Sequence, residues 1–246
     1  MDKKVANEYA NLISEITGQK SPRSSEEIAV LFESGKHEVL DVLELSQYAG
    51  WLAGSGQFDR AEHIANSIQD ASIQQRTLAV IAQRMIASGI LDKAKILLDR
   101  RRTKPTEIAA TEINARVELA QAYGQRGDTE LASAILTETE ELIKPEGLED
   151  FERAEYLFVL ANGWLIAGDQ DRSKQLYIEA FDRAQRSFET TQAAGGNGYD
   201  ERRLSLAIIR RLVKSGMLSE ANHLTSLIAD EFWRHEANAL IAEPGK

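Results

Sequence analysis

Residues 78–98 of this 246-residue chain read LAVIAQRMIASGILDKAKILL in one-letter code. Apolar side chains before Gly89 recur every three or four residues, at Leu78, Ile81, Ala82 and Met85. That spacing is typical of an amphipathic helix, and a second apolar run with helical spacing follows Gly89. A glycine just past a helix can adopt the left-handed conformation that ends it. The stretch therefore predicts two helices joined by a tight turn at Gly89.

The same pattern recurs around four more glycines, so that the five anchors are Gly56, Gly89, Gly127, Gly168 and Gly216. Small residues dominate the positions seven before and five after the anchors, namely Ala49, Ala82, Ala120, Ala161 and Ile209, then Ala61, Ala94, Ala132, Ser173 and Ala221. Bulky residues stand four before and eight after, namely Leu52, Met85, Tyr123, Trp164 and Leu212, then Ile64, Leu97, Ile135, Leu176 and Leu224. This self-similarity predicts five helical hairpins, with the small residues where paired helices cross.

This order of small, bulky, glycine, small and aliphatic residues resembles the tetratricopeptide repeat over about residues 38–235. The resemblance implies a right-handed α-solenoid in which the first helix of each hairpin lines a concave groove for peptides or partner helices. The anchors are 33, 38, 41 and 48 residues apart, so the repeats are degenerate. Residues resembling the lysine pair of the family's carboxylate-clamp members are absent, so recognition of chaperone tails is not implied.

We expect an all-α protein with a single domain over residues 1–246. An N-terminal helical cap takes up residues 1–36, with helices from about 4 to 17 and from 25 to 35. The five hairpins take up residues 37–235, as units at about 37–70, 72–103, 106–144, 149–192 and 199–235, and 236–246 form a C-terminal tail. The three glycines in 193–198 separate the last two units.

Polar side chains recur six and thirteen positions before the anchors, where the resemblance places the concave face. They predict a partner-binding stripe of Arg76, Gln83, Asn114, Gln121, Asn162, Arg203 and Arg210. Side-chain amides both donate and accept hydrogen bonds, which suits binding to a peptide backbone. A solvent-facing stripe on any helix is also polar, and that alternative stays open.

Composition excludes several classes of partner and site. The chain holds 29 Lys and Arg against 39 Asp and Glu, a net charge of −10, which argues against nucleic acid and anionic membranes. Neither an apolar N-terminal signal nor a membrane-spanning apolar run is present in the sequence. We therefore expect a cytoplasmic protein. The absence of cysteine excludes disulfides and thiolate chemistry.

Two charge clusters have ordinary explanations. The basic run at 99–104 ends a predicted helix, where cations complement the exposed carbonyls, although it could also bind an acidic or phosphorylated ligand. The acidic residues from Glu138 to Glu152 predict a solvated face and a connector, with no calcium-loop spacing.

Nothing in the sequence gathers catalytic groups. None of the four histidines, His37, His63, His223 and His235, has a partner histidine at helical ligand spacing, and no phosphate loop or nucleophile elbow is present. We expect no enzyme activity, no cofactor and no metal, and interpret the chain as a scaffold, monomeric or homodimeric, for a protein or peptide. The alternatives are self-assembly through the apolar run 232–241 and, with less support, a small-ligand site near Trp51, Tyr123 and Trp164.

Overall fold

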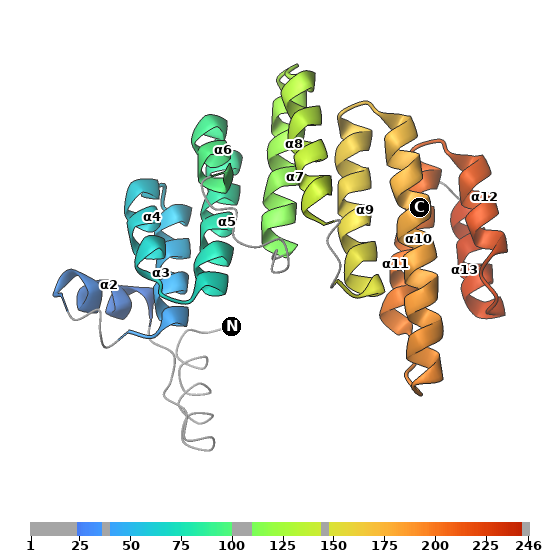
Figure 1. Cartoon of the computed structure of the whole chain (residues 1–246), viewed down its shortest axis with the longest axis horizontal. Coiled ribbons are helices and arrows are strands. Elements are labelled where there is room, and N and C mark those ends of the chain that lie inside the picture. Colours follow the sequence, from blue (N-terminus) through green and yellow to red (C-terminus); the bar gives the residue numbers. More distant parts are fainter. Residues whose placement is uncertain (1–23, 36–39, 100–109, 144–147, 243–246) are drawn as a thin grey trace. The chain divides into compact units, whose positions relative to one another are not determined.

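The computed structural model describes residues 24–35, 40–99, 110–143 and 148–242, and the regular structure in these ranges is entirely α-helical (Figure 1). The helices are α2 (Ser25–Glu33), α3 (Val42–Gly54), α4 (Phe58–Ser67), α5 (Ala71–Ala87), α6 (Leu91–Asp99), α7 (Ala110–Gln125), α8 (Thr129–Leu142), α9 (Asp150–Ile166), α10 (Gln170–Ala193), α11 (Tyr199–Lys214), α12 (Leu218–Ser226) and α13 (Glu231–Ala242). The all-α prediction is confirmed for these ranges.

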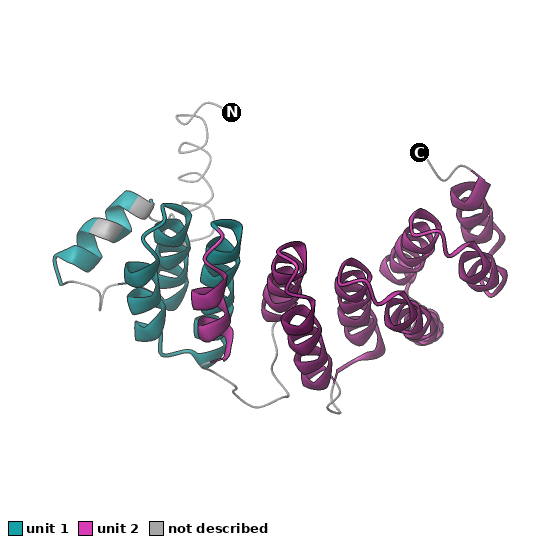
Figure 2. Cartoon of the chain, turned by 90° about the horizontal axis from the view of Figure 1, so that it is seen from above, with its two compact units in different colours: residues 1–88 teal, residues 89–246 magenta. Residues whose placement is uncertain are grey.

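The chain divides into two compact units, residues 1–88 and 89–246 (Figure 2). In the first unit, α3 packs on α2, α4 and α5. In the second unit, three pairs pack side by side, α7 with α8, α9 with α10, and α11 with α12. The first helices of these pairs also contact one another, α7 with α9 and α9 with α11, while α13 packs on α11 and α12. A single domain and a right-handed solenoid stay predictions.

All five anchor glycines lie between consecutive helices and have positive φ, from 76° at Gly89 to 91° at Gly168. At Gly56, Gly127, Gly168 and Gly216 the residue after the glycine donates its backbone N–H to the carbonyl five residues earlier, as Gln57 does to Leu52 at 2.9 Å. This is the Schellman arrangement, which satisfies carbonyls at the end of a helix.

The residues seven and four positions before the anchor glycines, and five and eight positions after them, form four columns of the repeat that make up the core. Every residue in them is buried, and Ala49, Ala82, Ala120 and Ala161 are at most 1% exposed. A methyl group at these positions lets neighbouring backbones approach more closely than a larger side chain would. These positions are therefore core positions, and their place at helix crossings stays a prediction.

Side-chain caps begin several helices. Ser24 Oγ accepts from the Glu27 backbone N–H at 3.2 Å, and Glu27 Oε2 accepts from the Ser24 backbone N–H at 2.7 Å. The two bonds form a capping box that starts α2. Asp169 caps α10, because its Oδ1 accepts from the Arg172 backbone N–H at 2.9 Å. Asp128 stands at the N-cap of α8 but makes no side-chain capping bond.

The helix boundaries predicted near the two ends of the chain agree with the structure only in part. The predicted second helix of the cap corresponds to α2, whereas the predicted helix at 4–17 lies outside the described residues. The boundary placed at 235 falls inside α13, so residues 236–242 continue a helix. The last four residues lie outside the described ranges.

Candidate functional site

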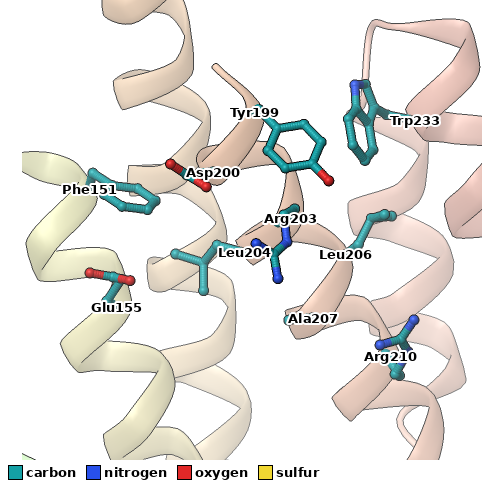
Figure 3. A pocket seen from close by; sticks show the side chains of 10 residues that line it. All are labelled: Phe151, Glu155, Tyr199, Asp200, Arg203, Leu204, Leu206, Ala207, Arg210 and Trp233. Atoms are coloured by element: carbon teal, nitrogen blue, oxygen red, sulfur yellow. The ribbon is translucent and has the colours of Figure 1, made fainter. Parts of the chain in front are cut away.

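An open pocket of about 600 Å³ lies in the second unit, between α9, α11 and α13 (Figure 3). Its lining combines aromatic, apolar, acidic and basic side chains: Phe151, Glu155, Tyr199, Asp200, Arg203, Leu204, Leu206, Ala207, Arg210 and Trp233. Most of them belong to the first three turns of α11.

One face of α11 forms the floor of this pocket. Arg203, Leu206, Ala207 and Arg210 recur at three- and four-residue spacing and therefore share a face. Seven residues of helix place the Cα atoms of Arg203 and Arg210 about 10 Å apart along the axis. Ile208, Ile209 and Leu212 are fully buried, which fixes the orientation of the helix.

The first turn of α11 is held against α10. Glu201 is buried and its Oε1 accepts from Thr191 Oγ1 at 2.7 Å. Arg202 is also buried, donates from Nη1 to Gln185 Oε1 at 2.7 Å, and places its guanidinium carbon 3.4 Å from the centre of the Phe188 ring. A guanidinium over an aromatic face is attracted by the ring quadrupole. These contacts hold the pocket-forming turn in place.

α9 supplies Phe151 and Glu155, one turn apart. The start of this helix is tied to α10 by Asp150, which accepts from Arg183 Nη1 at 2.8 Å and from Arg186 Nε at 3.4 Å. Partial burial opposes ionisation of Asp150, but the hydrogen bonds from Arg186 and Arg183 lower the pKa of this carboxyl below its ordinary value. The wall of the pocket at α9 is therefore anchored by ion pairs.

α13 supplies Trp233. The indole meets the Tyr199 ring edge to face, with centroids 5.8 Å apart and planes at 63°, a favourable aromatic geometry. At the start of α13, Asp230 Oδ1 accepts from the backbone N–H of Trp233 at 3.1 Å. Two aromatic rings from α11 and α13 thus stand together at one end of the pocket (Figure 3).

Both signs of charge face this pocket. Arg203 and Arg210 are exposed, and neither makes an ion pair or a hydrogen bond with the residues that the structure describes. The Arg203 guanidinium lies 5.8 Å from the Tyr199 ring centre. Desolvation and the carboxylates of Asp200 and Glu152 raise the pKa of Glu155 above its ordinary value.

The predicted stripe is only partly brought together. Arg203 and Arg210 share the pocket with Glu155, which stands thirteen positions before Gly168 as Arg203 does before Gly216. Asn114 and Gln121 are half-buried on α7 of the same unit. On α5 of the first unit, Arg76 is exposed and Gln83 is half-buried.

Asn162, the other predicted stripe residue, has internal hydrogen bonds. Its Oδ1 accepts from Tyr177 Oη at 2.9 Å and from Arg211 Nε, and its Nδ2 donates to the Phe158 carbonyl at 2.7 Å. The side chain therefore links α9 with α10 and α11. The position of Asn162, six residues before Gly168, does not by itself predict these partners on other helices.

The sequence prediction missed the aromatic lining. Phe151, Tyr199 and Trp233 come from three helices, and no repeat position unites them. The one available signal was Trp233 in the last apolar run. The aromatic residues weighed for a small-ligand site lie elsewhere: Trp51 stacks on Tyr48 in the first unit, while Tyr123 and Trp164 are buried in the second.

The structure describes part of the two predicted charge clusters and three of the four histidines. Glu140 is buried and ion-paired with Arg172, so the prediction of a solvated acidic face is wrong at that residue. The basic run at 99–104 lies outside the described ranges from residue 100 onward, as does His37. His63, His223 and His235 are exposed. In the parts of the chain with described coordinates, no three His, Asp or Glu residues gather as a metal site would require.

No protein-family model matches the chain, and neither the curated proteins nor the solved structures include a significant match. Each helix in the described ranges is too short or too polar to cross a bilayer.

Proposed function

We propose that the chain is a polypeptide-binding protein and that the pocket between α9, α11 and α13 holds a peptide or a partner helix. The observation that carries this proposal is the meeting of Arg203 and Arg210 with Tyr199 and Trp233 at one open pocket. Arginine and large aromatic residues contribute disproportionately to binding energy at protein interfaces. The resemblance to the tetratricopeptide repeat points to the same class of ligand.

The shape of the site favours a polypeptide over a small molecule. The floor follows α11, which at sixteen residues is about 24 Å long. Small-molecule sites commonly enclose most of the ligand surface, whereas Arg203 and Arg210 are exposed at this open pocket. A peptide laid along α11 could contact both guanidiniums at once. Asn114 and Gln121 on α7 are proposed as further contacts, and Arg76 and Gln83 stay predicted contacts.

A displayed library of random peptides tests this proposal. Peptides of about 16 residues match the length of α11 in helical form. Enriched peptides would be synthesised, and their dissociation constants measured by fluorescence anisotropy against the wild type and Arg203→Glu/Arg210→Glu. Arg84→Glu is the matched control, because Arg84 is an exposed arginine on α5 of the other unit.

The proposal expects enriched peptides that the double reversal weakens at least tenfold and that Arg84→Glu leaves unchanged. Circular dichroism would establish that each variant is folded. A library that yields no binder, or binders equally tight for the wild type and the double reversal, contradicts the assignment of this pocket.

A second candidate function is self-association near the C-terminal helices. Phe232 is 64% exposed on α13, and Leu218 and Leu227 are exposed at the two ends of α12. Single exposed apolar residues are common on monomers, so this candidate ranks second. Sedimentation equilibrium of the wild type and Phe232→Glu tests it, since self-association through this surface predicts a dimer that the substitution dissociates.

A further inference from the structure

We infer that the polypeptide held in this pocket carries charges of both signs on opposite edges, with an acidic side chain at Arg210 and a basic side chain between Glu155 and Asp200. The inference rests on the proposed function and specifies the chemistry of its ligand. It follows from three features of the lining: two arginines that lack a carboxylate partner among the described residues, a pair of neighbouring carboxylates, and an apolar strip beside them.

The arginines form the first feature. Four other arginines of the second unit, Arg116, Arg172, Arg183 and Arg186, each pair with a carboxylate. Arg203 and Arg210 have no such partner in the described residues, although the chain carries a net charge of −10. A guanidinium binds a carboxylate through paired hydrogen bonds, and such charge-assisted bonds are stronger than neutral ones. An acidic side chain of the ligand would supply this partner.

The carboxylates form the second feature. Glu155 stands on α9 and Asp200 on the first turn of α11, and Figure 3 shows both on the side of the pocket nearest Phe151. Desolvation is the main cause of the raised pKa of Glu155, and the carboxylate of Asp200 adds to it, because like charges that share a site oppose each other's ionisation. A Lys or Arg of the ligand placed here would relieve this repulsion.

The apolar strip is the third feature. Leu204, Leu206 and Ala207 line the pocket along α11, and Trp233 faces it from α13. In Figure 3, Arg210 lies at the far end from Glu155 and Asp200. An amphipathic helix could place its apolar face on this strip and one charged edge on each side.

The mixed lining also determines which ligands are rejected. A uniformly acidic peptide would meet Glu155 and Asp200, and a uniformly basic one would meet Arg203 and Arg210. Like charges brought together at an interface suppress the wrong partner. A ligand with separated charges is therefore the class that this pocket selects.

Complementary charge reversal tests the inference. A peptide selected against the wild type would be resynthesised with its acidic residues changed to Lys, or with its basic residues changed to Glu. Each version would be measured against the wild type, Arg210→Glu and Glu155→Lys by fluorescence anisotropy. Arg84→Glu again serves as the control, and circular dichroism checks folding.

We expect each reversal, in the protein or in the peptide, to weaken binding about fivefold, which corresponds to about 1 kcal/mol for a partly exposed ion pair. The acid-to-Lys peptide should regain affinity for Arg210→Glu only, and the base-to-Glu peptide for Glu155→Lys only. Such specific rescue is not produced by a general loss of structure.

The outcomes separate this inference from the proposed function. Selected peptides that are uncharged or of one sign, or reversals without specific rescue, overturn the two-sign ligand while peptide binding at the pocket stands. Peptides that bind equally well to Arg203→Glu/Arg210→Glu, or a library without binders, overturn the proposed function and this inference with it.

Discussion

Gly198 lies directly against the ring of Phe188: a β-carbon at position 198 would stand 2.2 Å from Phe188 Cδ2 and 2.5 Å from Cε2. Gly198 also has a left-handed backbone, with φ of 59°, at the N-cap of α11. The next two residues, Tyr199 and Asp200, line the pocket. The close approach of Gly198 to Phe188 therefore lies directly before the residues of α11 that line the pocket.

Gly198→Ala is predicted to lower the free energy of unfolding by about 2–5 kcal/mol. A left-handed backbone costs a residue with a β-carbon about 1–2 kcal/mol, and the overlap with Phe188 adds about 1–3 kcal/mol for overpacking. Urea unfolding followed by circular dichroism measures the change.

Gly195→Ala is the matched control for this change. Gly195 has a similar φ of 84°, but its β-carbon would meet no atom within 4 Å. Only the cost of the left-handed backbone, about 1–2 kcal/mol, should remain. Equal losses for the two variants would show that the contact with Phe188 contributes nothing.

Arg116→Met is predicted to destabilise the second unit by about 3–5 kcal/mol, the usual cost of removing one partner from a buried ion pair. The Arg116 side chain is 2% exposed, bonds Glu112 Oε1 from Nε at 3.0 Å, and donates to the Leu98 carbonyl at 2.7 Å near the end of α6. Denaturant unfolding of Arg116→Met beside Glu112→Gln/Arg116→Met checks the account. The double variant should lose less stability than Arg116→Met, because the double variant leaves no carboxylate at position 112 opposite the lost guanidinium. A double variant that loses as much as Arg116→Met, or more, would contradict the coupling.

Asn162→Ala is predicted to reduce stability by about 1–3 kcal/mol while a folded sample keeps its peptide affinity. The substitution removes the bonds that join α9 to Tyr177 and Arg211, each contributing about 1 kcal/mol. Asn222→Ala is the control, since Asn222 is exposed and its side chain bonds, among the residues that the structure describes, only the Leu218 carbonyl of its own helix. A loss of affinity with unchanged stability would instead support Asn162 as a groove residue.

Glu155→Gln is predicted to stabilise the protein at neutral pH and to have little effect in acid. The pKa of Glu155 is raised in the folded protein from an ordinary value of 4.5, so folding disfavours the charged carboxylate. The penalty is absent well below pH 4.5, grows as pH rises towards the folded pKa, and is complete above it. The difference in unfolding free energy between Glu155→Gln and the wild type should therefore be near zero in acid and should rise as the pH increases. A difference that is constant with pH would contradict the raised pKa.

Local rules made much of the fold predictable from the sequence. The left-handed glycines, the small residues at crossings and the aliphatic positions each report a requirement within one hairpin, and all proved to be turns or core positions. Of the residues that line the pocket, the repeat spacing predicted Arg203 and Arg210. Trp233 and Phe151 reach it by packing between helices that are distant in sequence, and helical periodicity carries no information about such contacts.

The buried charges were missed for the same reason. Arg116 and Glu112 stand at the i,i+4 spacing of an ordinary surface pair. Their burial depends on the packing of α6 and other segments against α7, which the sequence of α7 alone does not contain. The division of the chain into two units likewise has no local signal at Gly89, which resembles the other four anchors.

The indole N–H signals of the three tryptophans test most directly whether this pocket binds polypeptide. Trp233 lines the pocket, Trp164 is buried in the same unit, and Trp51 stacks on Tyr48 in the other unit. The signals would be assigned in ¹H–¹⁵N spectra with single Trp→Phe variants and followed while a selected peptide is added. The account predicts a saturable shift of the Trp233 signal with the Trp51 signal unchanged. A peptide that binds while the Trp233 signal stays in place would contradict it.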